Sequence, residues 1–181
     1  MPLYQQLYRF FSHPYQLIKK LFDGGAFHCH RAGRAVKLAG FRIACGEVDG
    51  QCVAVSCHRH VPPPRRSPSG GFSELLLLAV DRGSERRGHG RALVAAVLRD
   101  SLDQRSPELL VVSTGHAFWQ QPHLGLSDRG DHCGHPIFIP WSAGIQLVGR
   151  AITAQAADDL DAVCNEATAG FTQVGFYTIL S

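Results

Sequence analysis

The sequence predicts an α/β fold, a twisted mixed sheet with helices on both faces, from three observations. Residues 75–80 are a continuous apolar run between glycine-bearing segments, as in a strand buried on both faces. After Gly90 the apolar residues recur at helical spacing, and residues 109–113 are a second short apolar run. A strand, a helix and a strand in succession predict a right-handed parallel crossover.

The composition is that of a single globular domain over residues 1–181, with 45% hydrophobic and 18% charged residues. A net charge of +3 gives no case for nucleic-acid binding. No apolar stretch is long enough to cross a bilayer, so we expect a soluble chain with no membrane partner. The six cysteines form no regular framework, which favours reduced thiols in the nucleus or cytoplasm.

The segments before the central strand are a helical region, a hairpin and a loop. Apolar residues at helical spacing predict two short helices within residues 3–22, interrupted at Pro14. Residues 40–59 contain two strand-like runs around Asp49-Gly50, a favoured tight-turn pair, and predict an antiparallel hairpin. Residues 61–71 are rich in Pro, Gly, Ser and Arg and predict a surface loop.

The helix after Gly90 is predicted to be amphipathic. Leu93, Val94, Val97 and Leu98 recur on one face, which we expect to be buried. The residues that we expect to remain in water are Arg91, Arg99 and Asp100.

The start of this helix is a candidate phosphate-binding corner. Gly88-His89-Gly90 lets the backbone approach a ligand closely, and the first turn of a helix has unpaired N–H groups. Three nearby charges, on Arg86, Arg87 and Arg91, suit a ligand with several phosphates. The alternative is a plain strand-to-helix turn, because Gly-x-Gly alone is a weak signal.

Residues 85–93, ERRGHGRAL, resemble the acetyl-CoA pyrophosphate loop of the GNAT acetyltransferase superfamily. Aligning the two glycines places Glu85 where the family has Gln or Arg. Upstream, Phe72-Ser73-Glu74 resembles the start of the same segment in the histone acetyltransferase branch. The resemblance implies that Glu74 is the general base that deprotonates a lysine ammonium; the alternative is a strand-end glutamate facing solvent.

The resemblance further implies an enzyme that moves an acetyl group from acetyl-CoA to a primary amine, most simply a lysine of a protein or peptide such as a histone. Two parallel strands would splay apart and hold the coenzyme between them. The implied coenzyme-binding residues are Leu78, Ala79, Val80, Arg86, Arg87, Gly88, His89, Gly90, Arg91, Ala92 and Phe118. The backbone of residues 78–80 would pair with the pantetheine arm, and the glycine loop would hold the pyrophosphate.

The similarity covers residues 40–126 well, residues 1–38 by analogy as a helical flap, and residues 127–181 poorly. Ala117-Phe118-Trp119 and Leu124-Gly125-Leu126 are similar to a later family motif. Trp119, however, occupies the position where many relatives have a tyrosine that protonates the leaving thiolate. An indole is no proton donor to a thiolate, so we predict no general acid there and interpret Trp119 as a core aromatic. The tail predicts strands over 136–140, 145–152 and 171–180, and a helix over 155–167.

Three other readings stay open. A non-catalytic acyl-CoA-binding or interaction domain would keep the fold, and a small-amine acetyltransferase would share the donor site. A zinc-stabilised module would use the clusters His28-Cys29-His30, Cys57-His58-Arg59-His60 and His132-Cys133-Gly134-His135. Their spacing has no zinc signature, so we predict no metal site and interpret them as surface histidines and buried thiols.

Overall fold

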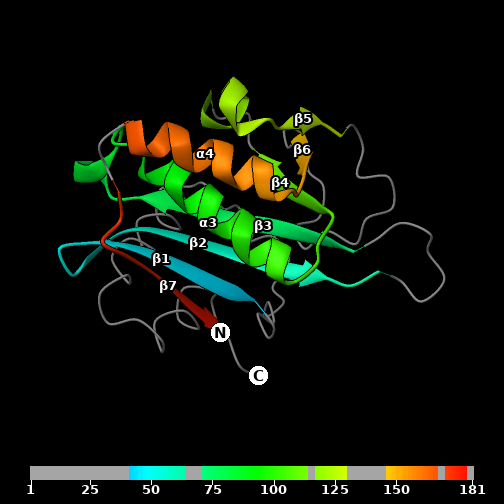
Figure 1. Ribbon diagram of the computed structural model, residues 1–181, viewed down its shortest axis with the longest axis horizontal. Helices are drawn as coiled ribbons and strands as arrows, with labels where there is room; N and C mark the ends of the chain where they lie inside the picture. The colour runs from blue at the N-terminus through cyan, green and yellow to red at the C-terminus, as the bar shows by residue number, and fades with distance from the viewer. Residues whose placement is uncertain (1–40, 64–70, 114–116, 130–145, 167–169, 179–181) are drawn as a thin grey trace, which may run out of the picture.

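The computed structural model describes residues 41–63, 71–113, 117–129, 146–166 and 170–178. Within these residues the chain forms one seven-stranded mixed sheet, in the order β5-β6-β4-β3-β2-β1-β7 (Figure 1). The strands are β1 (Arg42–Val48), β2 (Gln51–Val61), β3 (Phe72–Val80), β4 (Glu108–Ser113), β5 (Ser127–Asp128), β6 (Gln146–Ala151) and β7 (Gln173–Thr178).

The predicted hairpin is confirmed as β1 and β2, which pair antiparallel. Asp49 and Gly50 connect them with positive φ angles of 51° and 75°. Such a two-residue turn matches the right-handed twist of the flanking strands. Because Gly accepts positive φ without strain and Asp tolerates it, this pair fixes where the chain reverses.

Strand β3 is the centre of the fold, as the apolar run predicts, although it begins at Phe72 rather than Leu75. It pairs antiparallel with β2 on one side and parallel with β4 on the other. Helix α3 (His89–Asp103) connects the two parallel strands. The predicted strand-helix-strand crossover is therefore confirmed.

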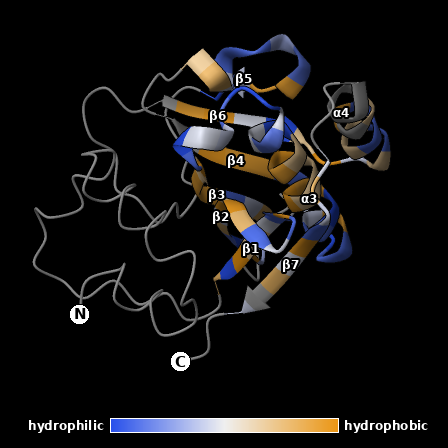
Figure 2. Cartoon of the chain, turned by 90° about the vertical axis from the view of Figure 1, so that its left-hand side faces the viewer, coloured by the Kyte–Doolittle hydropathy of each residue, from blue (hydrophilic) through white to orange (hydrophobic). Residues whose placement is uncertain are grey.

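Helix α3 packs one face on the sheet and against α4 (Ala154–Glu166), the predicted C-terminal helix. Figure 2 shows both helices on the same side of the sheet. Between them lies a core that includes Leu75, Leu98, Leu109 and Leu160. Burial of each such leucine stabilises the fold by about 1.5–3 kcal/mol. The helices predicted within residues 1–38 lie outside the described residues.

The predicted buried face of α3 is confirmed, because Leu93, Val94, Val97 and Leu98 are at most 1% exposed. Arg99 is exposed and pairs with Asp158 of α4 at 3.0 Å. The prediction that Asp100 stays in water is wrong, since Asp100 is only 7% exposed. Two polar residues of the sheet, Arg42 and His58, bind its carboxylate and make its burial possible.

The C-terminal part of the chain returns to the far edge of the sheet. Strand β7 lies within the predicted strand over 171–180 and pairs antiparallel with β1, so it closes that edge of the sheet. The predicted strand over 145–152 is confirmed as β6, which pairs with β4. Its predicted partner, residues 136–140, lies outside the described residues. No helix in the described segments is long and apolar enough to cross a membrane.

Candidate active site

The parallel strands β3 and β4 separate halfway along the sheet. Their pairing runs only from Ser73–Leu109 to Leu75–Val111, although β3 continues to Val80. Beyond Leu75, β3 still pairs with β2 through Leu78, Ala79 and Val80. In the part of the chain that the structure describes, the other edge of residues 77–80 has no strand partner. An extended ligand with amide groups can pair with such an edge.

The loop after β3 leads directly into the start of α3. A 3₁₀ turn, η2 (Arg82–Ser84), is closed by the Asp81 carboxylate, which accepts a hydrogen bond of 3.1 Å from Gly83 N–H. Gly88 then adopts φ 84° and precedes His89, so the helix begins within the predicted Gly88-His89-Gly90 corner. In the first backbone hydrogen bond of the helix, Ala92 N–H donates to Gly88 C=O at 3.0 Å. Among the described residues no side chain caps this end, so its first N–H groups are suited to an anion.

The charges around this helix start lie at the surface. Arg86 and Arg87 are exposed, and Arg91 is half-buried one turn further on. Arg86 has a φ of 61°, in the left-handed region. The structure therefore places the three predicted phosphate-binding arginines around the first turn of α3, where the helix dipole also favours negative charge.

His89 is held differently from its neighbours. Its imidazole is 4% exposed and stacks on Phe171 with ring centroids 5.2 Å apart. Burial, and then the charge of Arg87, lower the pKa of His89 below its ordinary value. Because the ring packs against the protein, a role for His89 in ligand binding would use its backbone N–H.

Three of the predicted coenzyme-binding residues, Leu78, Gly90 and Phe118, lie together. A Cβ on Gly90 would come within 3.1 Å of the Phe118 ring and 3.6 Å of Leu78. Phe118 belongs to η3 (Ala117–Gln120) and meets Trp119 edge to face at 4.7 Å. Trp119 packs against the main core, as predicted. A side chain at position 90 would therefore push the Phe118 ring away by a few tenths of an ångström, so Gly90 favours close packing between the helix start and η3.

The second glycine corner is also confirmed. Gly125 follows η4 (Pro122–Leu124) with φ 60°, and a side chain from β6 fixes the corner. Arg150 Nη1 donates to the Leu124 carbonyl at 2.6 Å. Burial, and then the charge of Arg91, lower the pKa of His123 in η4.

Glu74, the predicted general base, lies on β3 one residue before its pairing with β4 ends. It is 0% exposed, so the alternative of a solvent-facing glutamate is wrong. Arg59, its register partner on β2, donates to Glu74 Oε2 from both Nε and Nη2 at 2.7 Å. The Arg59 guanidinium lies 5.4 Å from the centre of the Phe41 ring. Burial, and then the charge of Glu74, raise the pKa of the Cys57 thiol.

Sequence reasoning missed both Arg59 and Phe41. A charged residue inside a strand of otherwise apolar and small residues was the available signal, because such a residue needs a partner when buried. The partner could not be named, since the strand register depends on the loop between β2 and β3.

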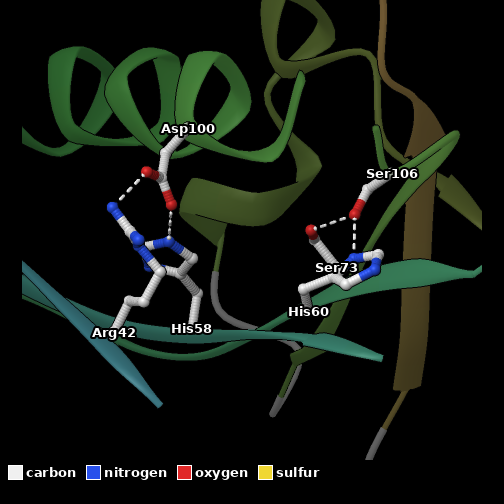
Figure 3. Close-up of polar contacts among 6 residues, drawn as sticks. All are labelled: Arg42, His58, His60, Ser73, Asp100 and Ser106. Carbon is white, nitrogen blue, oxygen red and sulfur yellow. Dashed lines mark hydrogen bonds and ion pairs between the residues drawn. The ribbon is translucent and has the colours of Figure 1, made fainter. Parts of the chain in front are cut away.

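The histidines of the Cys57–His60 cluster belong to two separate polar networks, one between the sheet and α3 and one between the sheet and the turn that follows α3 (Figure 3). His58 Nε2 lies 2.8 Å from Asp100 Oδ2, and Arg42 Nη2 lies 2.6 Å from Asp100 Oδ1. In the second network, His60 Nδ1 lies 2.5 Å from Ser106 Oγ, which accepts a hydrogen bond from Ser73 at 2.7 Å.

The interpretation of these histidines as surface residues is wrong for His58, which is 1% exposed. The interpretation of Cys57 as a buried thiol is confirmed. Within the described residues no group of three or more His, Cys, Asp or Glu could hold a metal ion. The clusters at residues 28–30 and 132–135 lie outside the described residues.

Comparison with solved structures supports the fold. No protein-family model matches the chain, and no curated protein matches it. Among solved structures, Tetrahymena GCN5 is 20% identical, with 83% of this chain and 84% of that chain covered and a TM-score of 0.52.

A second solved structure is N-acetylglutamate synthase from Neisseria gonorrhoeae in complex with coenzyme A and N-acetyl-glutamate. It is 18% identical, with 78% of this chain and 32% of that chain covered and a TM-score of 0.54. Such low identities establish the fold alone. The chain has the α/β fold of the GNAT acetyltransferases.

Proposed function

We propose that the protein is an acetyl-CoA-dependent N-acetyltransferase whose acceptor is a lysine of a protein or peptide, such as a histone tail. One observation carries the proposal: β3 and β4 stop pairing after Leu75 and Val111, beside a helix whose N-terminus bears Gly88-His89-Gly90. This arrangement offers a backbone edge and an anion site in immediate succession. A coenzyme with a peptide-like arm and a pyrophosphate needs both.

Acetyl-CoA would lie along β3 with its pyrophosphate at α3. The amides of the pantetheine arm would pair with the backbone of residues 78–80, which has no strand partner on that edge among the described residues. The pyrophosphate would accept hydrogen bonds from the first N–H groups of α3. Arg86, Arg87 and Arg91 would supply charge, and Phe118 would border the site through its packing on Gly90.

Glu74 would act as the general base. It would take one proton from the lysine ammonium, directly or through a water molecule, because an ammonium has no free electron pair for attack. The amine nitrogen then attacks the thioester carbonyl, the new C–N bond forms, and the C–S bond breaks. The departing thiolate takes a proton from water, which receives the second amine proton. Along β3, about 20 Å separate Glu74 from Val80, at about 3.3 Å per residue.

The proposed acceptor rests on the resemblance of Phe72-Ser73-Glu74 to the start of this segment in the histone acetyltransferase branch, a resemblance that implies a lysine acceptor. A small primary amine would use the same donor machinery, and the acceptor panel below includes such amines. A protein acceptor predicts transfer to peptides in preference to free amines.

A non-catalytic acyl-CoA-binding domain is the second candidate. The observation in its favour is that Glu74 is 0% exposed and already paired with Arg59. A binding domain would take up coenzyme A and form no amide. Amide formation therefore separates the two candidates.

The experiment combines binding and turnover. Coenzyme A binding is measured by calorimetry, and acetyl transfer is measured by mass spectrometry on histones, lysine peptides and small amines. We expect binding and peptide acetylation in the wild type, and binding without acetylation in Glu74→Gln. Binding without any amide product would support the binding domain, and absence of binding would overturn both candidates.

A further inference from the structure

Arg59 is in direct contact with the proposed base, Glu74. Both its Nε and its Nη2 donate to Glu74 Oε2, at 2.7 Å each. We propose, on the basis of the function proposed above, that Arg59 is the positioning residue that fixes the Glu74 carboxylate for proton transfer.

The geometry suits this role because the pair is held from three neighbouring segments. Arg59 on β2 and Glu74 on β3 are direct register partners, so their side chains leave the same face of the sheet. Phe41, which precedes β1 and is 2% exposed, lies 5.4 Å from the guanidinium carbon of Arg59. The Phe41 ring attracts the Arg59 guanidinium, and the guanidinium donates two hydrogen bonds to one oxygen of the Glu74 carboxylate.

Burial makes the orientation of Glu74 matter. The carboxylate is 0% exposed whereas Arg59 is 22% exposed, so the carboxylate has little freedom of its own. Proton transfer needs the base within hydrogen-bond reach of the amine or of one intervening water. A displacement of about 1 Å costs up to roughly 100-fold in rate, which is the effect that we assign to loss of Arg59.

The chain offers a matched control in Arg42. This arginine is 28% exposed, contacts the buried carboxylate of Asp100 at 2.6 Å, and lies 5.7 Å from the centre of the Phe176 ring. It thus repeats the chemistry of Arg59 on the opposite face of the sheet, under α3. Loss of Arg42 removes a buried pair of the same kind without touching Glu74.

The experiment uses the full chain and four variants: Arg59→Ala, Arg59→Lys, Arg42→Ala and Glu74→Gln. Acetyl transfer to the best peptide of the panel is measured with and without guanidinium chloride well below denaturing concentration, against matched sodium chloride. Circular dichroism gives the folded fraction, and calorimetry gives coenzyme A affinity. Guanidinium can refill the space left by Arg59→Ala and restore kcat if Arg59 positions Glu74. It would not restore kcat if the variant had only a structural defect.

We expect Arg59→Ala to lower kcat about 100-fold and to leave the KM for acetyl-CoA within about twofold. Guanidinium should then restore kcat at least about tenfold in Arg59→Ala and leave Glu74→Gln unchanged. Arg59→Lys should stay about tenfold below the wild type, because an ammonium does not reproduce two N–H donors in a fixed plane. Arg42→Ala should keep kcat per folded molecule and show no response to guanidinium.

Two results would overturn the inference while the proposed function stands: full activity in Arg59→Ala, or a loss that guanidinium does not restore in folded protein. If Arg59→Ala does not fold, Arg59→Lys decides, and wild-type kcat in that variant would overturn the inference. A wild type that forms no amide with any acceptor would overturn the proposed function and this inference together, and it is recognised before any variant is made.

Discussion

The two faces of the sheet carry the same pair of groups in different settings. On one face Arg59 binds the fully buried Glu74 and lies over Phe41; on the other Arg42 binds the buried Asp100 and lies over Phe176. In both pairs the carboxylate is at most 7% exposed and the arginine 22–28% exposed. Burial, charge and aromatic contact are thus nearly matched, so these features alone do not distinguish a pair in an active site from a pair that stabilises the fold.

The difference lies in what each pair connects. Asp100 belongs to α3, and its partners Arg42 and His58 belong to β1 and β2, so this cluster joins helix to sheet. Glu74 and Arg59 are both sheet residues, and they lie where β3 loses its pairing with β4. We infer that the first cluster stabilises the fold and that the second serves the chemistry. The predictions below test this division.

The largest expected effect is on catalysis, in Glu74→Gln. We expect kcat for acetyl transfer to fall about 1,000-fold, or about 4 kcal/mol in the barrier, because the amide takes up no proton. The variant also leaves Arg59 without a charged partner, so kcat is expressed per folded molecule from circular dichroism. Retention of wild-type kcat would remove Glu74 from the mechanism.

The next effect is on stability, in Asp100→Asn. Removal of one partner from a buried ion pair leaves Arg42 uncompensated, and we expect the free energy of unfolding to fall by about 3 kcal/mol. Activity per folded molecule should stay at the wild-type value. Urea denaturation measures the first quantity and peptide acetylation the second. An active-site role for Asp100 would instead appear as lost kcat at unchanged stability.

A smaller effect is expected on donor affinity, in Arg87→Ala. Loss of one charge from the pyrophosphate site should weaken coenzyme A binding about tenfold, or about 1.4 kcal/mol, in calorimetry at fixed salt. Arg82→Ala is the control, because Arg82 is an exposed arginine in η2 of the same loop. Equal losses in both variants would indicate a diffuse charge effect rather than a site.

The smallest effect concerns pH and the start of α3. Burial and Arg87 lower the pKa of His89 in the folded chain, so the unfolded chain binds more protons. Stability from this group is therefore present above the ordinary pKa of about 6.5 and is lost as pH falls through it. His89→Phe, which can keep the stack on Phe171, should flatten the fall in stability between about pH 7.5 and 5.5. His123, whose pKa is lowered as well, keeps part of that fall. An unchanged pH dependence in His89→Phe would contradict this assignment.

The sequence predicted much of the fold because local patterns determine it. Two strand-like runs around a tight-turn pair and two continuous apolar runs identified β1 to β4, and the patterns after Gly90 and over 155–167 identified α3 and α4. Asp100 was misjudged because its side chain was classed by polarity alone. Its position seven residues after Leu93 lies on the buried stripe of the helix, and only the partners Arg42 and His58 explain how a carboxylate fits there.

The candidate site was predicted in part, for a related reason. The glycine corner at α3 and the carboxylate on β3 are visible as short motifs, whereas their surroundings depend on register. The pairing of Arg59 with Glu74 depends on the β2–β3 register and on the irregularity between Cys57 and His58. The end of the β3–β4 pairing is likewise set by tertiary packing, which no local pattern contains.

Hydrogen–deuterium exchange with and without coenzyme A tests whether a coenzyme occupies the edge of β3 that has no strand partner among the described residues. We expect slower exchange of the amides in residues 77–80 and at the start of α3, and little change in β1 and β7. Coenzyme A binding with protection elsewhere, or no binding at all, would contradict this expectation.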